Sequence, residues 1–203
     1  MITGSGEETR ELMIDAAIRI VAEFGFEGFT TKKWASEAGV AEGSLYYHFG
    51  NKNDLLDRAF ISIDREIAAL YDNFSAGEVA ADEINGLICE LWLRYFHYLV
   101  ENPEKTKYYY RFRTSPRYTA EIIKEEFSFF GSFIDAASRV NDLTDYRNRL
   151  NQNVLWSFIM DSTTGLAYRV ITGAVQYNEE VEKEMLILIS GGLLGALLKL
   201  EAR

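Results

Sequence analysis

The spacing of apolar residues constrains the fold of this chain most strongly, because it follows a helical period through most of its length. Between residues 12 and 24 apolar side chains recur three or four positions apart, at Met13, Ala17, Ile20, Val21 and Phe24. No alternating strand pattern persists beyond a few residues, except around residues 108–113. The 2 prolines and 15 glycines are too few for the many tight turns of a β-sandwich or barrel. The sequence therefore predicts an all-α protein of about nine helices.

Composition excludes several protein classes. A chain of 203 residues that is 48% hydrophobic can build a core and is not disordered. Its single cysteine, Cys89, excludes an internal disulfide framework. The longest strongly apolar run, residues 185–198, falls short of the roughly 18–20 residues needed to cross a bilayer. The first residues also lack the basic and apolar regions of a signal peptide. We therefore expect a soluble, cytoplasmic protein with no membrane partner.

Residues typical of enzymes are sparse. The only histidines are His48 and His97, and no cysteine or histidine spacing fits a zinc site. No glycine-rich phosphate-binding loop is present, and the doublet Glu125-Glu126 has the character of a solvated face. We expect no metal, no cofactor and no catalytic residues. The alternative of an all-α enzyme with an aromatic-lined pocket would require a buried acid–base pair, which the sequence does not reveal.

A helix-turn-helix pattern is the feature with the clearest functional meaning. Two short predicted helices, 31–38 and 42–49, are joined by a turn that contains Gly39. On a helical wheel, Leu45 and Phe49 share the face that we expect in the core. A separate arc carries a hydroxyl, a phenol and an imidazole, which can bond base edges or phosphate oxygens. It consists of Ser44, Tyr47 and His48, with the small Gly43 at its edge.

At this point the segment TTKKWASEAGVAEGSLYYHFGNKNDLL resembles the DNA-binding signature of the TetR (tetracycline-repressor-like) family. The resemblance covers about residues 12–56 and rests on many fixed offsets, which include the Ala38-Gly39-Val40 turn and the Leu45-Tyr46 pair. It implies a three-helix head at residues 1–51 and a larger effector-binding and dimerisation body at 52–203. It further implies a homodimeric transcriptional regulator, most often a repressor released from a palindromic operator by a small hydrophobic ligand. A regulator without such an effector is the alternative.

The resemblance also implies which residues touch DNA. Positions matching Thr31 and Lys52 hold phosphates in the family, and Trp34 replaces a smaller aliphatic residue. Glu42 stands where a basic or neutral residue is common, and it either accepts from a cytosine or is favoured only by the helix dipole. Thr31 could equally act as a cap, and Tyr46 could be mostly packed. The expected DNA-contacting set is Thr31, Lys32, Lys33, Glu42, Gly43, Ser44, Tyr46, Tyr47, His48 and Lys52.

The charge balance limits how strongly such a head can attract DNA. The whole chain carries a net charge of −10, and residues 1–60 hold 6 basic against 10 acidic side chains. Residues 28–53, however, hold 3 basic and 2 acidic side chains. Charges farther away than the Debye length of about 8 Å are largely screened. We therefore expect a weakly positive DNA-facing surface, binding that requires a dimer, and a steep dependence on salt.

The rest of the chain is rich in aromatic residues at helical spacing. For each of them core packing is the simpler interpretation, but together they suit a cavity for a hydrophobic effector. Arg111 and Arg113 could anchor an anionic part of such a ligand. The expected effector-binding set is Trp92, Tyr95, Phe96, Tyr109, Phe112, Phe127, Phe130, Trp156 and Met160.

The last predicted helix is apolar on almost every side, so it requires two buried faces. Its glycines would let a second helix approach closely, which favours an interface between two copies of the chain. The alternatives are a central core helix of a monomer or a module that binds a different protein. The expected dimer contacts are Ile187, Gly191, Leu194, Gly195 and Leu198.

Overall fold

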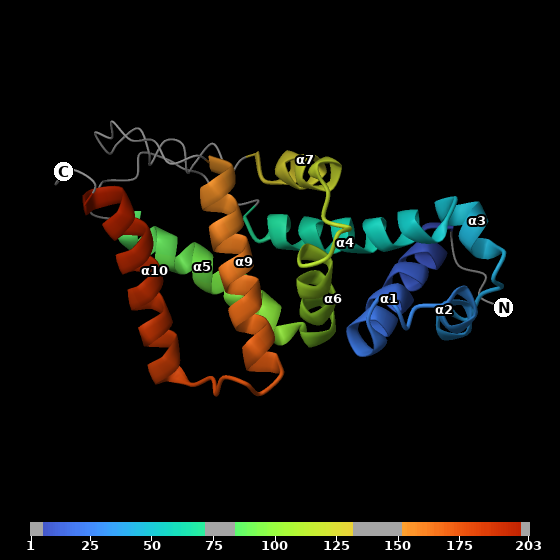
Figure 1. Ribbon diagram of the computed structural model, residues 1–203, viewed down its shortest axis with the longest axis horizontal. Coiled ribbons are helices and arrows are strands. Elements are labelled where there is room, and N and C mark those ends of the chain that lie inside the picture. Colours follow the sequence, from blue (N-terminus) through green and yellow to red (C-terminus); the bar gives the residue numbers. More distant parts are fainter. Residues whose placement is uncertain (1–5, 72–83, 132–151, 200–203) are drawn as a thin grey trace. The chain divides into compact units, whose positions relative to one another are not determined.

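The computed structural model describes residues 6–71, 84–131 and 152–199. Within these residues the chain forms nine helices and no strand, which confirms the predicted all-α class (Figure 1). None of the helices in these ranges is long and apolar enough to cross a membrane. The helices are α1 (Gly6–Phe24), α2 (Thr31–Ala38), α3 (Ser44–Phe49), α4 (Lys52–Ala69), α5 (Ile84–Glu101), α6 (Pro103–Arg113), α7 (Ala120–Phe129), α9 (Gln152–Ile171) and α10 (Glu179–Lys199).

The chain divides into two compact units. Unit 1 comprises Met1–Glu66 and Asn102–Phe127, so it contains α1 to α3, most of α4, α6 and nearly all of α7. Unit 2 comprises Ile67–Glu101 and Ser128–Arg203, and it contains α5, α9 and α10. Compactness thus groups α6 and α7 with the N-terminal helices, whereas the division of function at residue 51 stays a prediction.

In unit 1, α1 packs against both α2 and α6. Its predicted apolar stripe is buried from Met13 to Val21, with Met13, Ala17 and Val21 fully covered, but Phe24 at the end of the helix is 46% exposed. Trp34 of α2 is also fully buried, and its indole N–H donates to the Met13 carbonyl over 2.8 Å. The large ring at this position therefore anchors α2 to α1 by a hydrogen bond as well as by packing.

A buried polar cluster lies among α4, α6 and the residues of α7. Arg113 and Glu126 form an ion pair at 2.5 Å, and their side chains are 2% and 0% exposed. The Tyr109 hydroxyl donates to Asp64 Oδ1 over 2.6 Å, and the Tyr118 hydroxyl donates to Glu126. The expectation that Glu126 lies on a solvated face is therefore wrong. The doublet Glu125-Glu126 does not reveal in sequence that the fold places Arg113 next to Glu126.

Burial raises the pKa of Asp64 well above its ordinary value near 3.8, and the nearby Glu126 carboxylate adds to the effect. Hydrogen bonding by Tyr109 and the charge of Arg113 oppose the rise only in part. Asp64 Oδ2 is buried and has no hydrogen-bond partner among the described residues. A proton on Asp64 therefore lowers the cost of burying this carboxyl.

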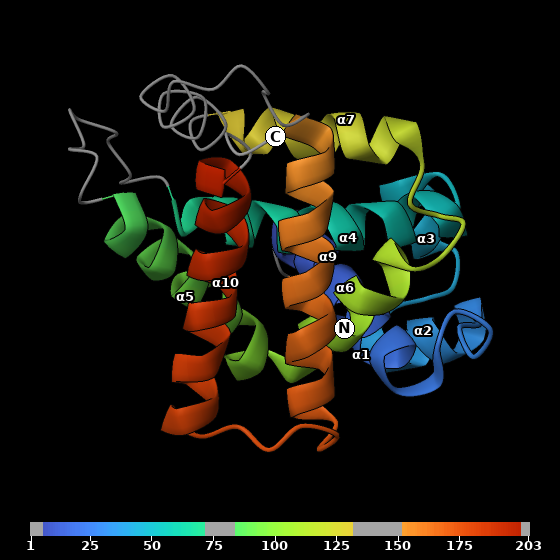
Figure 2. The same cartoon turned by 60° about the vertical axis from the view of Figure 1, so that its left-hand side comes forward.

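In unit 2, α5 packs against α9 and α10 (Figure 2). The polar ends of two buried aromatic residues of α5 are satisfied by threonines of α9. Trp92 Nε1 donates to Thr163 Oγ1 over 2.8 Å, and the Tyr95 hydroxyl shares a 2.7 Å bond with Thr164 Oγ1. These two bonds fix the register of α5 against α9 while the rings remain in the apolar core.

A polar contact joins α5 to α10. His97 Nε2 lies 2.8 Å from Glu182 Oε2 and 3.1 Å from the Tyr177 hydroxyl, which also donates to Glu182. The Tyr177 hydroxyl, followed by His97, lowers the pKa of Glu182. His97 therefore links α5 to α10 through Glu182 and Tyr177.

Candidate nucleic-acid interface

The predicted helix-turn-helix is present in unit 1. The Thr30 hydroxyl accepts from the Lys33 backbone N–H over 3.2 Å, so Thr30 is the N-cap of α2. Gly39 ends α2 with a φ of +67°, a left-handed conformation that side chains disfavour. The Val40 N–H then returns to the Ala35 carbonyl over 3.0 Å, and the chain turns toward α3.

The second helix of the motif begins later than the sequence predicts. We expected it from residue 42, but α3 starts at Ser44. The residues before it are held by short-range bonds, from Ser44 N–H to the Ala41 carbonyl and from Leu45 N–H to the Glu42 carbonyl. Glu42 therefore lies in the tight turn before α3 and is not part of the α-helix.

The two faces of α3 are divided as the helical wheel predicts. Leu45 and Phe49 are 0% and 1% exposed, whereas Tyr47 is 87% exposed. Tyr46 is 68% exposed, so the alternative that it is mostly packed is wrong. His48 is half-buried, and its ring lies edge-on to that of Tyr47 at 4.9 Å. Two phenols thus project from a helix whose other face is locked into the core.

Thr31 and Glu42, both expected to contact DNA, contact each other. The Thr31 hydroxyl donates to Glu42 Oε2 over 3.4 Å. Both residues lie at the protein surface, so a DNA phosphate approaching Thr31 meets the Glu42 carboxylate as well. The cap of α2 is Thr30, which leaves the Thr31 hydroxyl available to this contact.

The three expected lysines differ in their surroundings. Lys52 Nζ donates to the Phe29 carbonyl over 2.8 Å, and Lys33 Nζ lies 2.7 Å from the centre of the Phe24 ring. Lys32 is exposed. Lys52 and Lys33 are thus held by unit 1, whereas Lys32 extends from its surface. Phosphate contacts by all three remain predictions.

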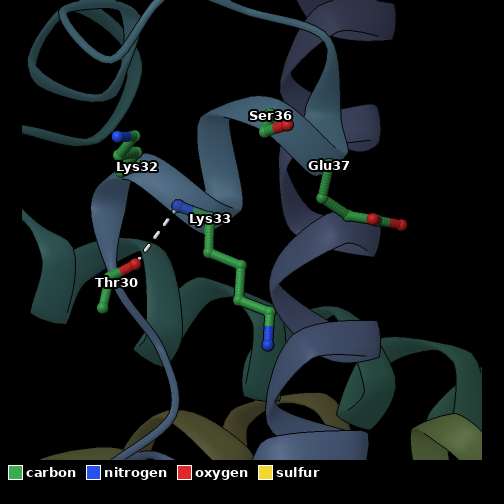
Figure 3. Close-up of a pocket in the computed structure, with 5 residues that line it drawn as sticks. All are labelled: Thr30, Lys32, Lys33, Ser36 and Glu37. Atoms are coloured by element: carbon green, nitrogen blue, oxygen red, sulfur yellow. Dashed lines mark hydrogen bonds between the residues drawn. The ribbon is translucent and has the colours of Figure 1, made fainter.

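The outer surface of α2 is slightly hollowed. An open depression of about 400 Å³ is lined by Thr30, Lys32, Lys33, Ser36 and Glu37. Figure 3 shows Lys32 and Lys33 leaving α2 in different directions, with Glu37 one turn farther along the helix. Glu37 forms an ion pair with Arg19 at 2.8 Å, so its charge is already compensated.

The nine expected effector-binding residues fall into both units. All are buried except the half-buried Phe127. In unit 1, Tyr109 and Phe112 stack on Phe60, with ring centres 4.9 and 4.3 Å apart. The members in unit 1 are Tyr109, Phe112 and Phe127, and those in unit 2 are Trp92, Tyr95, Phe96, Phe130, Trp156 and Met160.

The two arginines expected to anchor an anion are engaged within unit 1. Arg113 pairs with the buried Glu126, so the expectation is wrong for Arg113. Arg111 Nη1 donates to the Val21 carbonyl at the last turn of α1 over 2.5 Å. The pattern of the sequence could not show that the fold supplies these arginines with partners.

Apolar side chains of α10 lie exposed. Ile187 is 68% and Leu188 is 74% exposed, and a Cβ atom added at Gly191 would meet nothing within 4 Å. Val154 and Phe158 of α9 are exposed as well, which the sequence reasoning missed. The side chains of Leu194, Gly195 and Leu198 lie outside the described residues, so their contacts stay predictions.

Sequence reasoning also missed Arg117, which follows α6 and contacts the start of α4. A lone arginine in a turn has no periodicity that could identify it. Its partners lie about 60 positions earlier in the chain and become neighbours only through the fold.

Comparisons with known proteins agree with the geometry. The family model described as "Bacterial regulatory proteins, tetR family" matches residues 13–59. The chain is similar to the HTH-type transcriptional repressor AcnR of Corynebacterium glutamicum, with 28% identity over 90% of this chain and 91% of that protein. It is 40% identical to the tetracycline repressor protein class D of Escherichia coli, over 34% of this chain and 31% of that protein.

Solved structures show the same fold. A TetR family transcription regulator from Marinobacter aquaeolei has a TM-score of 0.76 at 22% identity, over 91% of this chain and 94% of that one. The regulator FadR from Bacillus subtilis, solved in complex with stearoyl-CoA, has a TM-score of 0.61 at 16% identity, over 90% of this chain and 98% of that one. The likeness therefore extends over both units and is not restricted to the helix-turn-helix.

Proposed function

Because this chain belongs to the TetR family of bacterial transcriptional regulators, we propose that it is a repressor that binds palindromic DNA as a homodimer and is released by a small hydrophobic effector. The observation that carries the DNA-binding part is the division of α3 into a locked and an open face. Leu45 and Phe49 hold the helix, and Tyr46 and Tyr47 stand exposed beside it. Phenol groups projecting from the second helix of such a motif can reach base edges in the major groove.

Repression is supported by the names of relatives, since AcnR and the tetracycline repressors are both described as repressors. The test uses purified full-length protein and a random-sequence DNA library, from which bound duplexes are recovered over several rounds. We expect a palindromic sequence whose half-sites are roughly 34 Å apart, one for each subunit. Recovery of duplexes with no shared sequence would contradict operator recognition.

The dimer is supported by the exposed apolar side chains of α9 and α10. Phe158 and Leu188 are 59% and 74% exposed, and large side chains in contact with water mark surfaces that bind other proteins. A palindromic site requires a two-fold symmetric protein. Sedimentation of the purified protein should give twice the chain mass, and a monomer that still binds the palindrome would contradict the proposal.

The effector is proposed to bind in unit 2, between α5 and α9. The ring centre of Phe130, which follows α7, lies 4.5 Å from that of Trp156 of α9, and Trp92 stacks on Phe96 of α5 at 5.0 Å. The polar ends of Trp92 and Tyr95 are bonded to threonines, which leaves ring faces and the Met160 thioether to contact a ligand. The stearoyl-CoA in the FadR structure indicates a long acyl chain as the first ligand to try.

The effector test exploits tryptophan fluorescence. Binding of stearoyl-CoA should quench Trp92 or Trp156 and weaken the complex with the selected duplex. Since coupling is reciprocal, the duplex must weaken stearoyl-CoA binding by the same factor, and a tenfold effect requires about 1.4 kcal/mol. Quenching with equal affinity in the presence and absence of the duplex would favour the alternative, a regulator without an effector of this kind.

A further inference from the structure

The turn that follows α6 reaches the start of α4 through one side chain. Arg117 Nη1 donates to Asn53 Oδ1 over 3.0 Å, and its Nη2 donates to the Asn53 carbonyl over 3.2 Å and to Asp57 Oδ1 over 2.9 Å. Its guanidinium also lies 5.7 and 5.9 Å from the ring centres of Phe26 and Phe112. A planar guanidinium that binds a backbone carbonyl and two side chains fixes both the position and the direction of its partners.

Arg117 is largely shielded from water. Its side chain is 23% exposed and that of Asp57 is 35% exposed. Burial raises the pKa of Asp57, and the hydrogen bond and charge of Arg117 oppose this rise. Loss of the guanidinium would leave a partly buried carboxylate without its main partner, so α4 would have to shift or hydrate there.

The start of α4 is tied closely to the recognition helix α3. Only Gly50 and Asn51 separate Phe49, the end of α3, from Lys52, the start of α4. The Asn51 side chain accepts from the backbone N–H groups of Asn53 and Asp54 over 2.8 and 3.0 Å. A displacement of Asn53 therefore passes through a short and bonded connection to α3.

The same segment holds the supporting helices at two further points. Arg58 of α4 pairs with Glu125 of α7 at 2.7 Å, and Arg111 of α6 donates to the last turn of α1. Residues 102–127 thus contact both α1 and α4, and these two helices belong to the same unit as α2 and α3. Among the residues that this segment contacts, the partners of Arg117, Asn53 and Asp57, lie nearest in sequence to α3.

We propose that Arg117 is a positioning residue for DNA recognition: by holding Asn53 and Asp57 it sets the angle at which α3 meets the major groove. The inference rests on the proposed function. Base contacts require α3 to be placed accurately, whereas phosphate contacts tolerate a tilt. Loss of Arg117 should therefore reduce binding to the specific sequence more than binding to unrelated DNA. A smaller folded fraction would instead lower both affinities by the same factor.

The test compares two dissociation constants for each full-length variant. One is for the duplex selected by the wild-type protein, and the other is for an unselected duplex of equal length at the same salt concentration. For Arg117→Ala we expect selected binding to weaken about tenfold and unselected binding to change less than about threefold. Arg117→Lys keeps a cation near Asp57, so its preference for the selected over the unselected duplex should lie between those of Arg117→Ala and the wild type. Arg94→Ala removes an equal charge from an exposed ion pair in unit 2 and should leave the ratio unchanged.

Should Arg117→Ala fail to fold, Asp57→Asn removes the charged partner of Arg117 with little change of shape. Its affinity for the selected duplex should then fall by a larger factor than its affinity for the unselected duplex. The inference is overturned when folded Arg117→Ala or Asp57→Asn protein keeps the wild-type ratio of the two dissociation constants. This includes the case in which both affinities fall by the same factor. A wild-type protein that selects no sequence at all overturns the proposed function, and this inference with it. A selecting wild type with unaffected variants overturns the role of Arg117 alone.

Discussion

The hydroxyl of Thr31 donates to a carboxylate oxygen of Glu42 over 3.4 Å, and this contact joins the first residue of α2 to the turn before α3. A negative charge thus stands beside a hydroxyl that the TetR resemblance assigns to a phosphate. The distance indicates a weak bond, so the charge of Glu42 affects DNA more than the bond itself does. Residues 28–53 hold three basic and two acidic side chains, and Glu42 is one of the two acidic ones.

The first prediction concerns Glu42. Glu42→Gln keeps an acceptor for Thr31 and removes the charge, so it should tighten binding to the selected duplex about threefold to tenfold at low salt. The gain should shrink at high salt, because the Debye length falls to about 3 Å at 1 M. Fluorescence anisotropy across a salt series measures both effects. Glu90→Gln, an exposed residue of unit 2, serves as the control. Weaker binding by Glu42→Gln would instead indicate that Glu42 reads a base.

The second prediction separates the two faces of α3. Tyr47→Ala and His48→Ala should keep the melting temperature near that of the wild type and cost about 1–3 kcal/mol of operator binding for each good contact. Leu45→Ala should destabilise unit 1 by about 2–5 kcal/mol, because Leu45 is fully buried. Thermal unfolding and duplex binding are measured on the same preparations. Unchanged operator affinity in a folded Tyr47/His48 double alanine protein would refute the assignment of this face.

The third prediction concerns the pH dependence of stability. The pKa of Asp64 is raised well above 3.8 in the folded protein, so above pH 3.8 the native state holds a proton that the unfolded chain releases. Stability therefore falls as the pH rises toward the folded pKa. Asp64→Asn mimics the protonated form and removes this loss. Its free energy of unfolding in urea, relative to wild type, should increase steadily from pH 4 to the folded pKa.

The control for this prediction is Asp15→Asn, an exposed residue of α1. This variant removes an exposed carboxylate in the same unit, so it reports the effect of losing one negative charge at the surface. A constant difference for Asp64→Asn would mean that the buried carboxyl is ionised and compensated in the folded protein, contrary to the prediction.

The fourth prediction concerns the proposed dimer. A Cβ atom added at Gly191 would meet nothing within 4 Å, and the residue is exposed, so we expect Gly191→Leu not to destabilise the isolated chain. Helix propensity alone would favour it by about 0.5–1 kcal/mol. In a dimer packed through this face, the added side chain should instead cost about 1–3 kcal/mol of association. Sedimentation equilibrium measures the shift toward monomer, and Asp15→Ala on the exposed surface of α1 is a control. An unchanged dimer would place the interface elsewhere.

Much of unit 1 could be predicted from local signals in the sequence. The apolar stripe of α1, the Thr30 cap, the positive φ of Gly39 and the burial of Leu45 each depend on residues within about one turn. Such features follow from helix geometry and from the backbone preferences of individual residues, both of which can be inferred from the sequence. The start of α3 was predicted two residues too early because a short-range turn and a helix share the same residues there.

The sequence by itself determined the helical class, the helix-turn-helix and the division of α3 into a buried and an exposed face, because each follows from the helical period and from residues close together in the chain. Only the tertiary structure decided that Glu126 pairs with Arg113, that Arg117 holds Asn53 and Asp57, and that the expected effector residues divide between two units. These contacts join residues up to 64 positions apart. A polar side chain gives the same local signal whether it faces water or a distant partner, and folding alone makes that choice.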